Sequence, residues 1–151
     1  MRTYLVVIDD SPEAMLALRF AARRAARTQG HVIVLTVIPP TDFLAFGGVQ
    51  ATIEAEAREH AEELVAAGAD AVVSEAGIMP TIMVQQGQPA DVVHLILDER
   101  PEVSALVLGA AASGPPGPLV AHFTGPDCGT LPCPVMIVPG GMDVERLATL
   151  S

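Results

Sequence analysis

Two short polar stretches of the chain carry residue types that could bind a ligand. One is Asp9-Asp10-Ser11, directly after the first apolar run, and the other is a small-residue loop that begins at Gly109. Carboxylates and hydroxyl groups can hold a cation or accept hydrogen bonds, and the backbone N–H groups of a glycine-rich loop can approach a phosphate. Such a loop is a weak signal by itself, so its meaning depends on the elements that position it.

The cationic residues exclude several kinds of chemistry. Lysine is absent, and all eight Lys and Arg positions are Arg. A Walker P-loop, a protein kinase and a Schiff-base enzyme each need a lysine, so these three classes are excluded. The hydrolase motif G-x-S-x-G is also missing from the sequence. We therefore expect a protein that is not an enzyme, and we assign no catalytic residues.

Charge and hydropathy restrict the partners. The formal net charge of −10 disfavours nucleic acid, because such binding depends on cationic contacts to phosphates. No apolar run reaches the roughly 18 residues needed to cross a bilayer. Asp9 and Asp10 interrupt the first apolar run too early for a signal peptide. We expect a cytoplasmic protein with no nucleic-acid or membrane partner.

The cysteines and one histidine pair are interpreted as structural. Cys128 and Cys133 have C-x4-C spacing, which is not a C-x-x-C motif, and no histidine with ligand spacing lies nearby. Buried thiols are the simpler interpretation. His94 and Asp98, four residues apart on an expected helix, are interpreted as an exposed pair. No metal-ligating residues are assigned.

Apolar runs and helical patterns alternate along the chain. Strands are expected at 4–8, 31–38, 78–86, 103–108 and 134–138, and helices at 12–29, 49–77, 89–100 and from 118 onward. The hydrophobic residues are mainly Val, Ile, Leu and Ala, with only 3% aromatics, which is typical of a parallel sheet covered on both sides. Met15 is expected in the apolar stripe of the first helix, with Gly30 as its C-cap. Residues 41–48 should form a mobile loop, and 140–151 a tail after a domain at 1–139.

The order of these elements predicts an open α/β fold with five parallel strands and helices on both faces. Pro80 cannot donate to a central ladder, so the third strand should lie at an edge. The strand order 3-2-1-4-5 satisfies this requirement and places a topological switch point between the first and fourth strands. The acidic turn after the first strand would then face the loop 109–117 across a crevice.

Several short motifs, in order, resemble the universal stress protein family. They are I-D-D-S after the first strand, A-L-R-F-A-A-R-R-A in the first helix, V-I-P-P after the second strand, G-Q-P-A-D before the third helix, L-V-L-G at the fourth strand and P-C-P-V-M-I-V at the fifth. The resemblance covers residues 2–139, nearly the whole chain. The paired acids also resemble a response-regulator receiver, but that family's Asp after strand three and Lys after strand five have no counterpart here.

The resemblance implies an adenine nucleotide, ATP or AMP, between the first and fourth strands, and a homodimer. By position, Asp9 would recognise the adenosine, Val37 would line the base pocket, and Gly109 would begin the phosphate loop. The chain departs from the family's G-x2-G-x9-G-[S/T] loop, because Ala112 stands at the second glycine and His122-Phe123 stand at the Gly-Ser pair. The segment S-G-P-P-G-P would build a different loop before a helix.

The altered loop leaves two interpretations open. In the first, the chain binds ATP or AMP. The paired acids would repel a triphosphate, so ATP would need Mg²⁺ beside it. AMP would be easier to hold, because His122 is the only cation expected near the loop. In the second, it is a dimeric interaction scaffold that binds no nucleotide tightly. The candidate ligand-binding residues are Asp9, Asp10, Ser11, Val37, Gly109, Ala110, Ser113, Gly114, Gly117 and His122.

Overall fold

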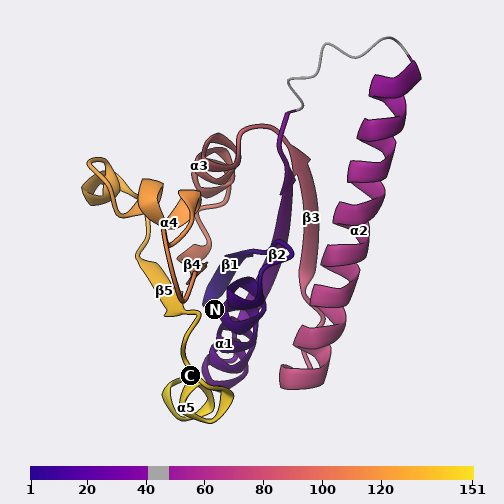
Figure 1. The fold of residues 1–151 in the computed structure, drawn as a ribbon. Coiled ribbons are helices and arrows are strands. Elements are labelled where there is room, and N and C mark those ends of the chain that lie inside the picture. Colours follow the sequence, from indigo (N-terminus) through magenta and orange to yellow (C-terminus); the bar gives the residue numbers. More distant parts are fainter. Residues whose placement is uncertain (41–47) are drawn as a thin grey trace.

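In the computed structural model, which describes residues 1–40 and 48–151, one open sheet lies between two layers of helices (Figure 1). The strands are β1 (Thr3–Val7), β2 (His31–Ile38), β3 (Thr81–Gln86), β4 (Val103–Ala110) and β5 (Val135–Pro139). The helices are α1 (Pro12–Thr28), α2 (Gly48–Ala76), α3 (Pro89–Glu99), α4 (Pro118–Phe123) and α5 (Val144–Leu150), with a 3₁₀ turn at Cys128–Thr130. The loop expected at 41–48 lies almost entirely outside the described residues.

All five strands are parallel, in the order β3-β2-β1-β4-β5. The predicted fold class and strand order are therefore confirmed. β3 is an edge strand, as Pro80 requires, but it begins at Thr81 rather than at residue 78. The proline, which lacks an N–H group, lies just before the ladder instead of within it.

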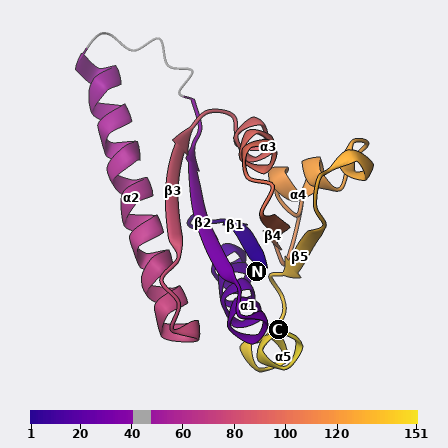
Figure 2. The same ribbon diagram turned by 180° about the vertical axis from the view of Figure 1, so that it is seen from behind.

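Each face of the sheet has its own apolar core. Helices α1 and α2 cover one face, and α3 and α4 cover the other, as the view from behind also shows (Figure 2). Side chains of β1 alternate between the two cores: Tyr4 and Val6 belong to the first and Leu5 to the second. The central strands are thus buried on both sides, which explains their continuous apolar sequences.

Helix α1 packs closely on the sheet because its buried side is mostly alanine. Its buried residues are Ala14, Ala17, Leu18, Ala21, Ala22 and Ala25. Met15, expected in this stripe, is 40% exposed, so that prediction is wrong. The C-cap is Gln29, in a left-handed conformation with φ 53°, rather than Gly30. Gly30 is needed for another reason, since a Cβ there would lie 2.3 Å from the carbonyl oxygen of Arg2.

Helix α2 is unbroken over 29 residues and lies against α1 and β2. Gly68 permits this approach, because a Cβ at that position would lie 2.9 Å from the Ile8 side chain. Glu75, near the end of α2, bonds to Arg19 at 2.6 Å and to Arg23 at 3.1 Å. Two half-buried arginines of α1 therefore tie the two helices together.

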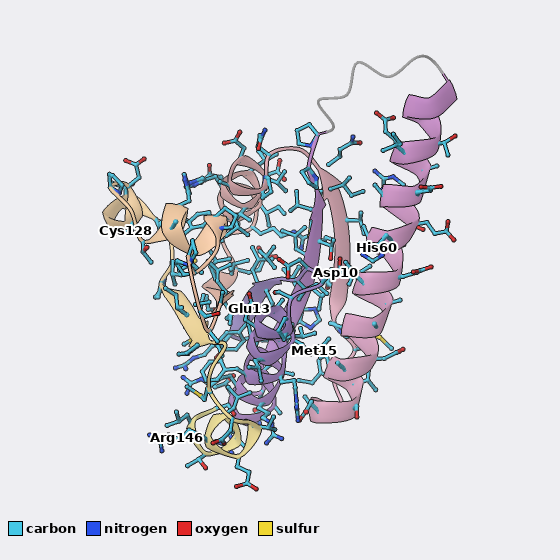
Figure 3. All side chains as sticks on the ribbon, viewed as in Figure 1. Asp10, Glu13, Met15, His60, Cys128 and Arg146 are labelled. Atoms are coloured by element: carbon cyan, nitrogen blue, oxygen red, sulfur yellow. The ribbon has the colours of Figure 1, made fainter. Side chains whose placement is uncertain are left out.

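The two cysteines differ in exposure. Cys133 is half-buried, and its burial raises the pKa of its thiol above the usual value. Cys128 is exposed on the segment that follows α4, where Figure 3 labels it, so the expectation of a buried thiol is wrong there. Cys128 begins the short exposed 3₁₀ turn between α4 and β5, instead of lying in a strand or a longer helix of a core.

The segment after β5 folds back onto α1. Helix α5 is capped by the Asp143 side chain and buries Leu147 in the core that α1 shares. The Arg27 guanidinium of α1 donates hydrogen bonds to the carbonyl oxygens of Ala148, at 3.3 Å, and of Ser151. Among the described residues, no helix combines the length and the apolar character that a membrane span requires.

Candidate functional site

The turn between β1 and α1 is held by hydrogen bonds among its own residues. The Asp9 carboxylate accepts a hydrogen bond from the Ser11 N–H at 2.9 Å and another from the Ser11 hydroxyl. The Ser11 hydroxyl oxygen accepts one from the Ala14 N–H at 3.2 Å, so Ser11 is the N-cap of α1. Asp9 is thereby fixed at the carboxyl end of β1.

The end of β4 lies against the first turn of α1 with no room for a side chain. A Cβ at Gly109 would lie 2.2 Å from the Glu13 carbonyl oxygen. Gly140, just after β5, is similarly restricted, because a Cβ there would lie 2.6 Å from the Ala110 carbonyl oxygen. The Gly140 N–H donates to that same oxygen at 2.7 Å. Two glycines thus allow the ends of β4 and β5 to meet the start of α1.

The loop between β4 and α4 is less constrained. Residues 112–116 are exposed, and one hydrogen bond, from the Ala111 N–H to the Pro116 carbonyl at 3.0 Å, closes the loop. Gly114 and Gly117 have φ values of 73° and 122°, where side chains are rarely accommodated. The loop ends at Pro118, in the first turn of α4, which is only six residues long.

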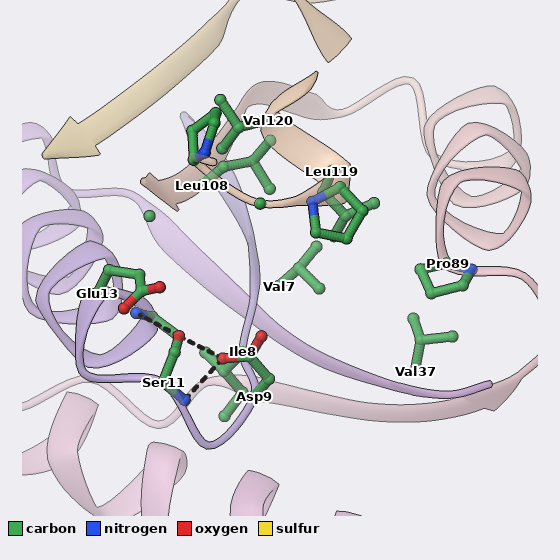
Figure 4. A pocket seen from close by; sticks show the side chains of 15 residues that line it. Val7, Ile8, Asp9, Ser11, Glu13, Val37, Pro89, Leu108, Leu119 and Val120 are labelled. Atoms are coloured by element: carbon green, nitrogen blue, oxygen red, sulfur yellow. Dashed lines mark hydrogen bonds between the residues drawn. The ribbon is translucent and has the colours of Figure 1, made fainter. Parts of the chain in front are cut away.

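A crevice with a cavity volume of about 160 Å³ lies between this loop and the β1–α1 turn (Figure 4). Its apolar walls come from β1, β2, β4 and α4, namely Val7, Val37, Leu108, Leu119 and Val120. Its polar groups are Asp9, Ser11 and Glu13. In Figure 4, Glu13 lies at one side of the crevice and Val37 at the other, with Asp9 between them. The predicted switch-point crevice is therefore present.

A second cavity, of about 330 Å³, adjoins the first through Asp9, Val37 and Pro89. It lies between the ends of β1 and β2 and the middle of α2, which contributes Ala57, His60, Ala61 and Leu64. Small-molecule sites commonly have volumes of roughly 300 Å³ or more. The first cavity is smaller than this, and the second is slightly larger.

An ion pair lies at the rim of the second cavity. His60 Nε2 is 2.8 Å from one carboxylate oxygen of Asp10 and 3.0 Å from the other (Figure 3). The hydrogen bond to Asp10, followed by its negative charge and that of Glu63, raises the pKa of His60 above its usual value. Both side chains are more than half exposed, so solvent screens the interaction.

The site residues predicted from the sequence either line the first cavity, line the second cavity or lie outside both. Asp9, Ser11, Val37, Gly109 and Gly117 line the first cavity. Asp10 lines the second cavity and faces α2.

The remaining candidates lie outside both linings. These are Ala110, Ser113, Gly114 and His122. Ala110 is engaged in β4, and its carbonyl oxygen accepts the Gly140 N–H. His122 lies on α4 and its Nε2 faces His94 of α3, at 2.9 Å. His94 therefore bonds to His122, whereas Asp98 was its expected neighbour.

Sequence reasoning missed Glu13 as a group of the crevice. It lies in the first turn of α1, where an acid is ordinarily explained by the positive end of the helix. Its position at the crevice follows from the contact between its backbone and Gly109, which joins residues 96 positions apart. Pro89, at the start of α3, was also missed, although the motif G-Q-P-A-D had marked that turn.

The crevice combines apolar walls with two acidic side chains, Asp9 and Glu13. Asp9 and Glu13 can accept hydrogen bonds from hydroxyl or amine groups, and the walls can enclose a flat ring. Among the residues lining the two cavities, His60 is the one that can carry a positive charge. Within residues 1–40 and 48–151, no group of three or more His, Cys, Asp and Glu side chains is arranged to hold a metal ion.

Several solved structures have this fold. A universal stress protein, UspA, from Lactobacillus plantarum is 18% identical with a TM-score of 0.74, over 91% of this chain and 97% of that one. A universal stress protein from Archaeoglobus fulgidus in complex with dAMP is 20% identical with a TM-score of 0.60, over 91% and 97%. Another universal stress protein, in complex with cAMP, is 17% identical with a TM-score of 0.61, over 91% and 96%.

Sequence comparison gives the family. No curated protein matches the sequence significantly. The model of the universal stress protein family matches residues 1–139, which span all five strands and helices α1 to α4. The chain therefore belongs to the universal stress protein family.

Proposed function

We propose that this chain binds an adenine nucleotide of low charge, such as AMP, in the crevice between β1 and β4. The nucleotide would act as a signal of the state of the cell, and no reaction would follow. The observation that carries the proposal is the crevice itself, where a fixed carboxylate faces apolar walls at the switch point of the sheet. Complexes of universal stress proteins with dAMP and cAMP are consistent with it.

The walls suit a nucleoside better than a phosphate. Val37 and Leu119, from β2 and α4, offer apolar surfaces for the base. Asp9 can accept a hydrogen bond from a ribose hydroxyl or from the amino group of adenine, because its carboxylate has acceptor capacity beyond the two bonds it makes to Ser11. The site therefore recognises the adenosine part by shape and by one acceptor.

Charge limits the phosphate chain. Asp9 and Glu13 lie at the crevice, and no Arg among the described residues lines either cavity. Each additional phosphate charge is repelled by these acids unless a cation such as Mg²⁺ lies between them. We therefore expect adenosine and AMP to bind more tightly than ATP, and ATP to depend on added Mg²⁺.

Calorimetric titration with adenosine, AMP and ATP tests the proposal. Asp9→Ala should weaken adenosine and AMP alike by at least about tenfold, the scale of a hydrogen bond to a charged group. Asp10→Ala is the matched control, because that neighbouring acid faces His60 instead of the first cavity. Glu13→Gln should strengthen AMP relative to adenosine. Equal affinities in the parent and the Asp9 variant would refute the assignment.

The acidic lining also favours a second candidate function. A crevice with two carboxylates and no arginine is poorly suited to any phosphate, as expected of a scaffold that acts through protein partners. The absence of heat with adenosine and AMP up to about millimolar concentration, where binding free energies are near 4 kcal/mol, would favour this scaffold. Release of adenine nucleotide from the denatured protein would exclude it.

Both candidate functions, nucleotide binding and the scaffold, include association into a homodimer. β5 is an edge strand, and Ile137 on it is 38% exposed. An apolar groove beside it is formed with Phe20, Met136, Met142 and Leu150. Exposed strand edges readily pair with another chain, so we expect two copies to meet along β5. Light scattering on the parent and on Ile137→Lys should give a dimer and a monomer respectively.

A further inference from the structure

Two histidines from different helices point their ring nitrogens at each other on the α3–α4 side of the sheet. His94 Nε2 and His122 Nε2 are 2.9 Å apart. The two ring planes are nearly perpendicular, with centroids 5.1 Å apart and an interplanar angle of 81°. In this hydrogen bond one nitrogen carries the proton and the other presents its lone pair. The same two nitrogens can therefore both direct lone pairs toward one small cation that replaces the proton.

The surroundings hold both rings in place. Phe123, which is 2% exposed, has its ring centroid 4.9 Å from that of His94 and 4.9 Å from that of His122. His94 is half-buried and follows the fully buried Val93 on α3. Because the backbone and one aromatic neighbour already order these rings, less entropy is lost on metal binding than for two free surface histidines.

We propose that His94 and His122 form a binding site for a divalent transition metal ion, with Zn²⁺ as the expected occupant. Neutral imidazole is a common ligand of such ions, with Zn–N bonds of about 2.0–2.1 Å. Two such bonds at a tetrahedral angle place the nitrogens about 3.3 Å apart. The observed nitrogens are 2.9 Å apart, so they need to separate by a few tenths of an ångström, and both rings need to turn so that their lone pairs meet at that angle instead of facing each other.

The coordination sphere is open. No third His, Cys, Asp or Glu of the described residues joins the pair in a metal-binding arrangement. Water molecules fill the remaining positions, so the ion is exchangeable, unlike that of a closed structural zinc site. Imidazole donors also suit Cu²⁺ and Ni²⁺, whereas Mg²⁺ and Ca²⁺ prefer oxygen ligands. The site should therefore bind Zn²⁺ and ignore Mg²⁺.

The location gives the ion a structural effect. α3 begins at Pro89 and α4 contains Leu119 and Val120, and all three residues line the first cavity. An ion between His94 and His122 would join two walls of that cavity. The metal site itself rests only on the two histidines and holds whether or not a nucleotide binds.

The test uses the full chain, stripped with EDTA and returned to buffer without chelator. Calorimetric titration with ZnCl₂ should give one ion per chain, and MgCl₂ should give none. Long-range ¹H–¹⁵N spectra resolve ring nitrogens of the four histidines, and those of His94 and His122 should shift together. His122→Ala and His94→Gln should each weaken Zn²⁺ binding by at least about tenfold, because loss of even an outer-shell partner of a metal ligand typically costs about 10- to 100-fold in affinity.

His60→Ala is the matched control, because His60, like His122, is an exposed histidine with a hydrogen bond to a different element, in this case Asp10 of the β1–α1 turn. Its Zn²⁺ affinity should equal that of the parent. His122 is exposed, so its replacement tests the site even where His94→Gln lowers stability. Unchanged affinity in His122→Ala, shifts confined to His31 or His60, or no Zn²⁺ binding at all would each overturn the proposal.

Discussion

The two sides of the crevice are built in opposite ways. On one side, Asp9, Ser11 and Ala14 form a chain of hydrogen bonds at the start of a 17-residue helix that is buried against the sheet. On the other side, residues 112–116 are exposed and lead to a helix of six residues. The first side is fixed by packing over its whole length, whereas the second depends on glycine conformation and one backbone hydrogen bond.

This difference gives the two sides of the site different properties, one being rigid and the other able to change shape. The β1–α1 turn is pre-organised, so it can position a carboxylate without a cost at the moment of binding. The β4–α4 loop can change its course without disturbing a core. The departures from the family's glycine pattern noted in the sequence fall at Ala112 in the loop and at His122 on the short α4, while the I-D-D-S turn is kept. In this chain the departures therefore lie on the less constrained side of the crevice.

One glycine at the end of β4 and one in the middle of the loop that follows should show the largest contrast. Gly109→Ala forces a Cβ to within 2.2 Å of the Glu13 backbone and should lower the free energy of unfolding by about 3 kcal/mol. Gly114→Ala meets no atom within 4 Å, and its φ of 73° should cost only about 1 kcal/mol. Urea unfolding of both variants measures the difference. Equal losses would contradict the contrast between the two sides.

Removal of the helix cap should have an intermediate effect. Ser11→Ala deletes the acceptor of the Ala14 N–H and the hydroxyl that bonds to Asp9, so the free energy of unfolding should fall by about 1 kcal/mol. Asp143→Ala, which removes the cap of the seven-residue α5, should cost less, because that helix has a single buried residue. Thermal unfolding of both variants measures the two losses of stability. A larger loss for Asp143→Ala than for Ser11→Ala would contradict a firmly held β1–α1 turn.

The smallest effect should come from the ion pair beside the turn. Asp10 raises the pKa of His60, so this contribution to stability is complete below the unfolded-state pKa of about 6.5 and is lost as pH rises through the higher folded-state value. An NMR titration should place the His60 midpoint above 6.5, and Asp10→Asn should move it down. A midpoint that does not respond to that change would show that α2 is not held to the turn.

The strand order could be read from the sequence because each step rested on local chemistry. Pro80 required an edge, alternating strands and helices required parallel pairing, and the apolar runs were too continuous for a sheet with one wet face. The same reasoning placed Asp9 and Gly109 on opposite sides of one crevice. It was less successful with single side chains, since Met15 and Cys128 are exposed against expectation. The exposure of a side chain depends on how a helix is rotated about its axis and on the path of a loop, and the spacing of apolar residues specifies neither closely.

By itself, the sequence determined the fold class, the order of the strands and the location of the crevice, because these follow from periodicity, proline chemistry and the handedness of crossovers. Only the tertiary structure decided which side chains enter the crevice. It placed Glu13 inside through the contact with Gly109, turned Asp10 toward His60, and turned His122 away from the crevice toward His94. Those pairs are separated by 28 or more positions, and contacts at such distances are set by how the helices pack on the sheet, which leaves no local mark in the sequence.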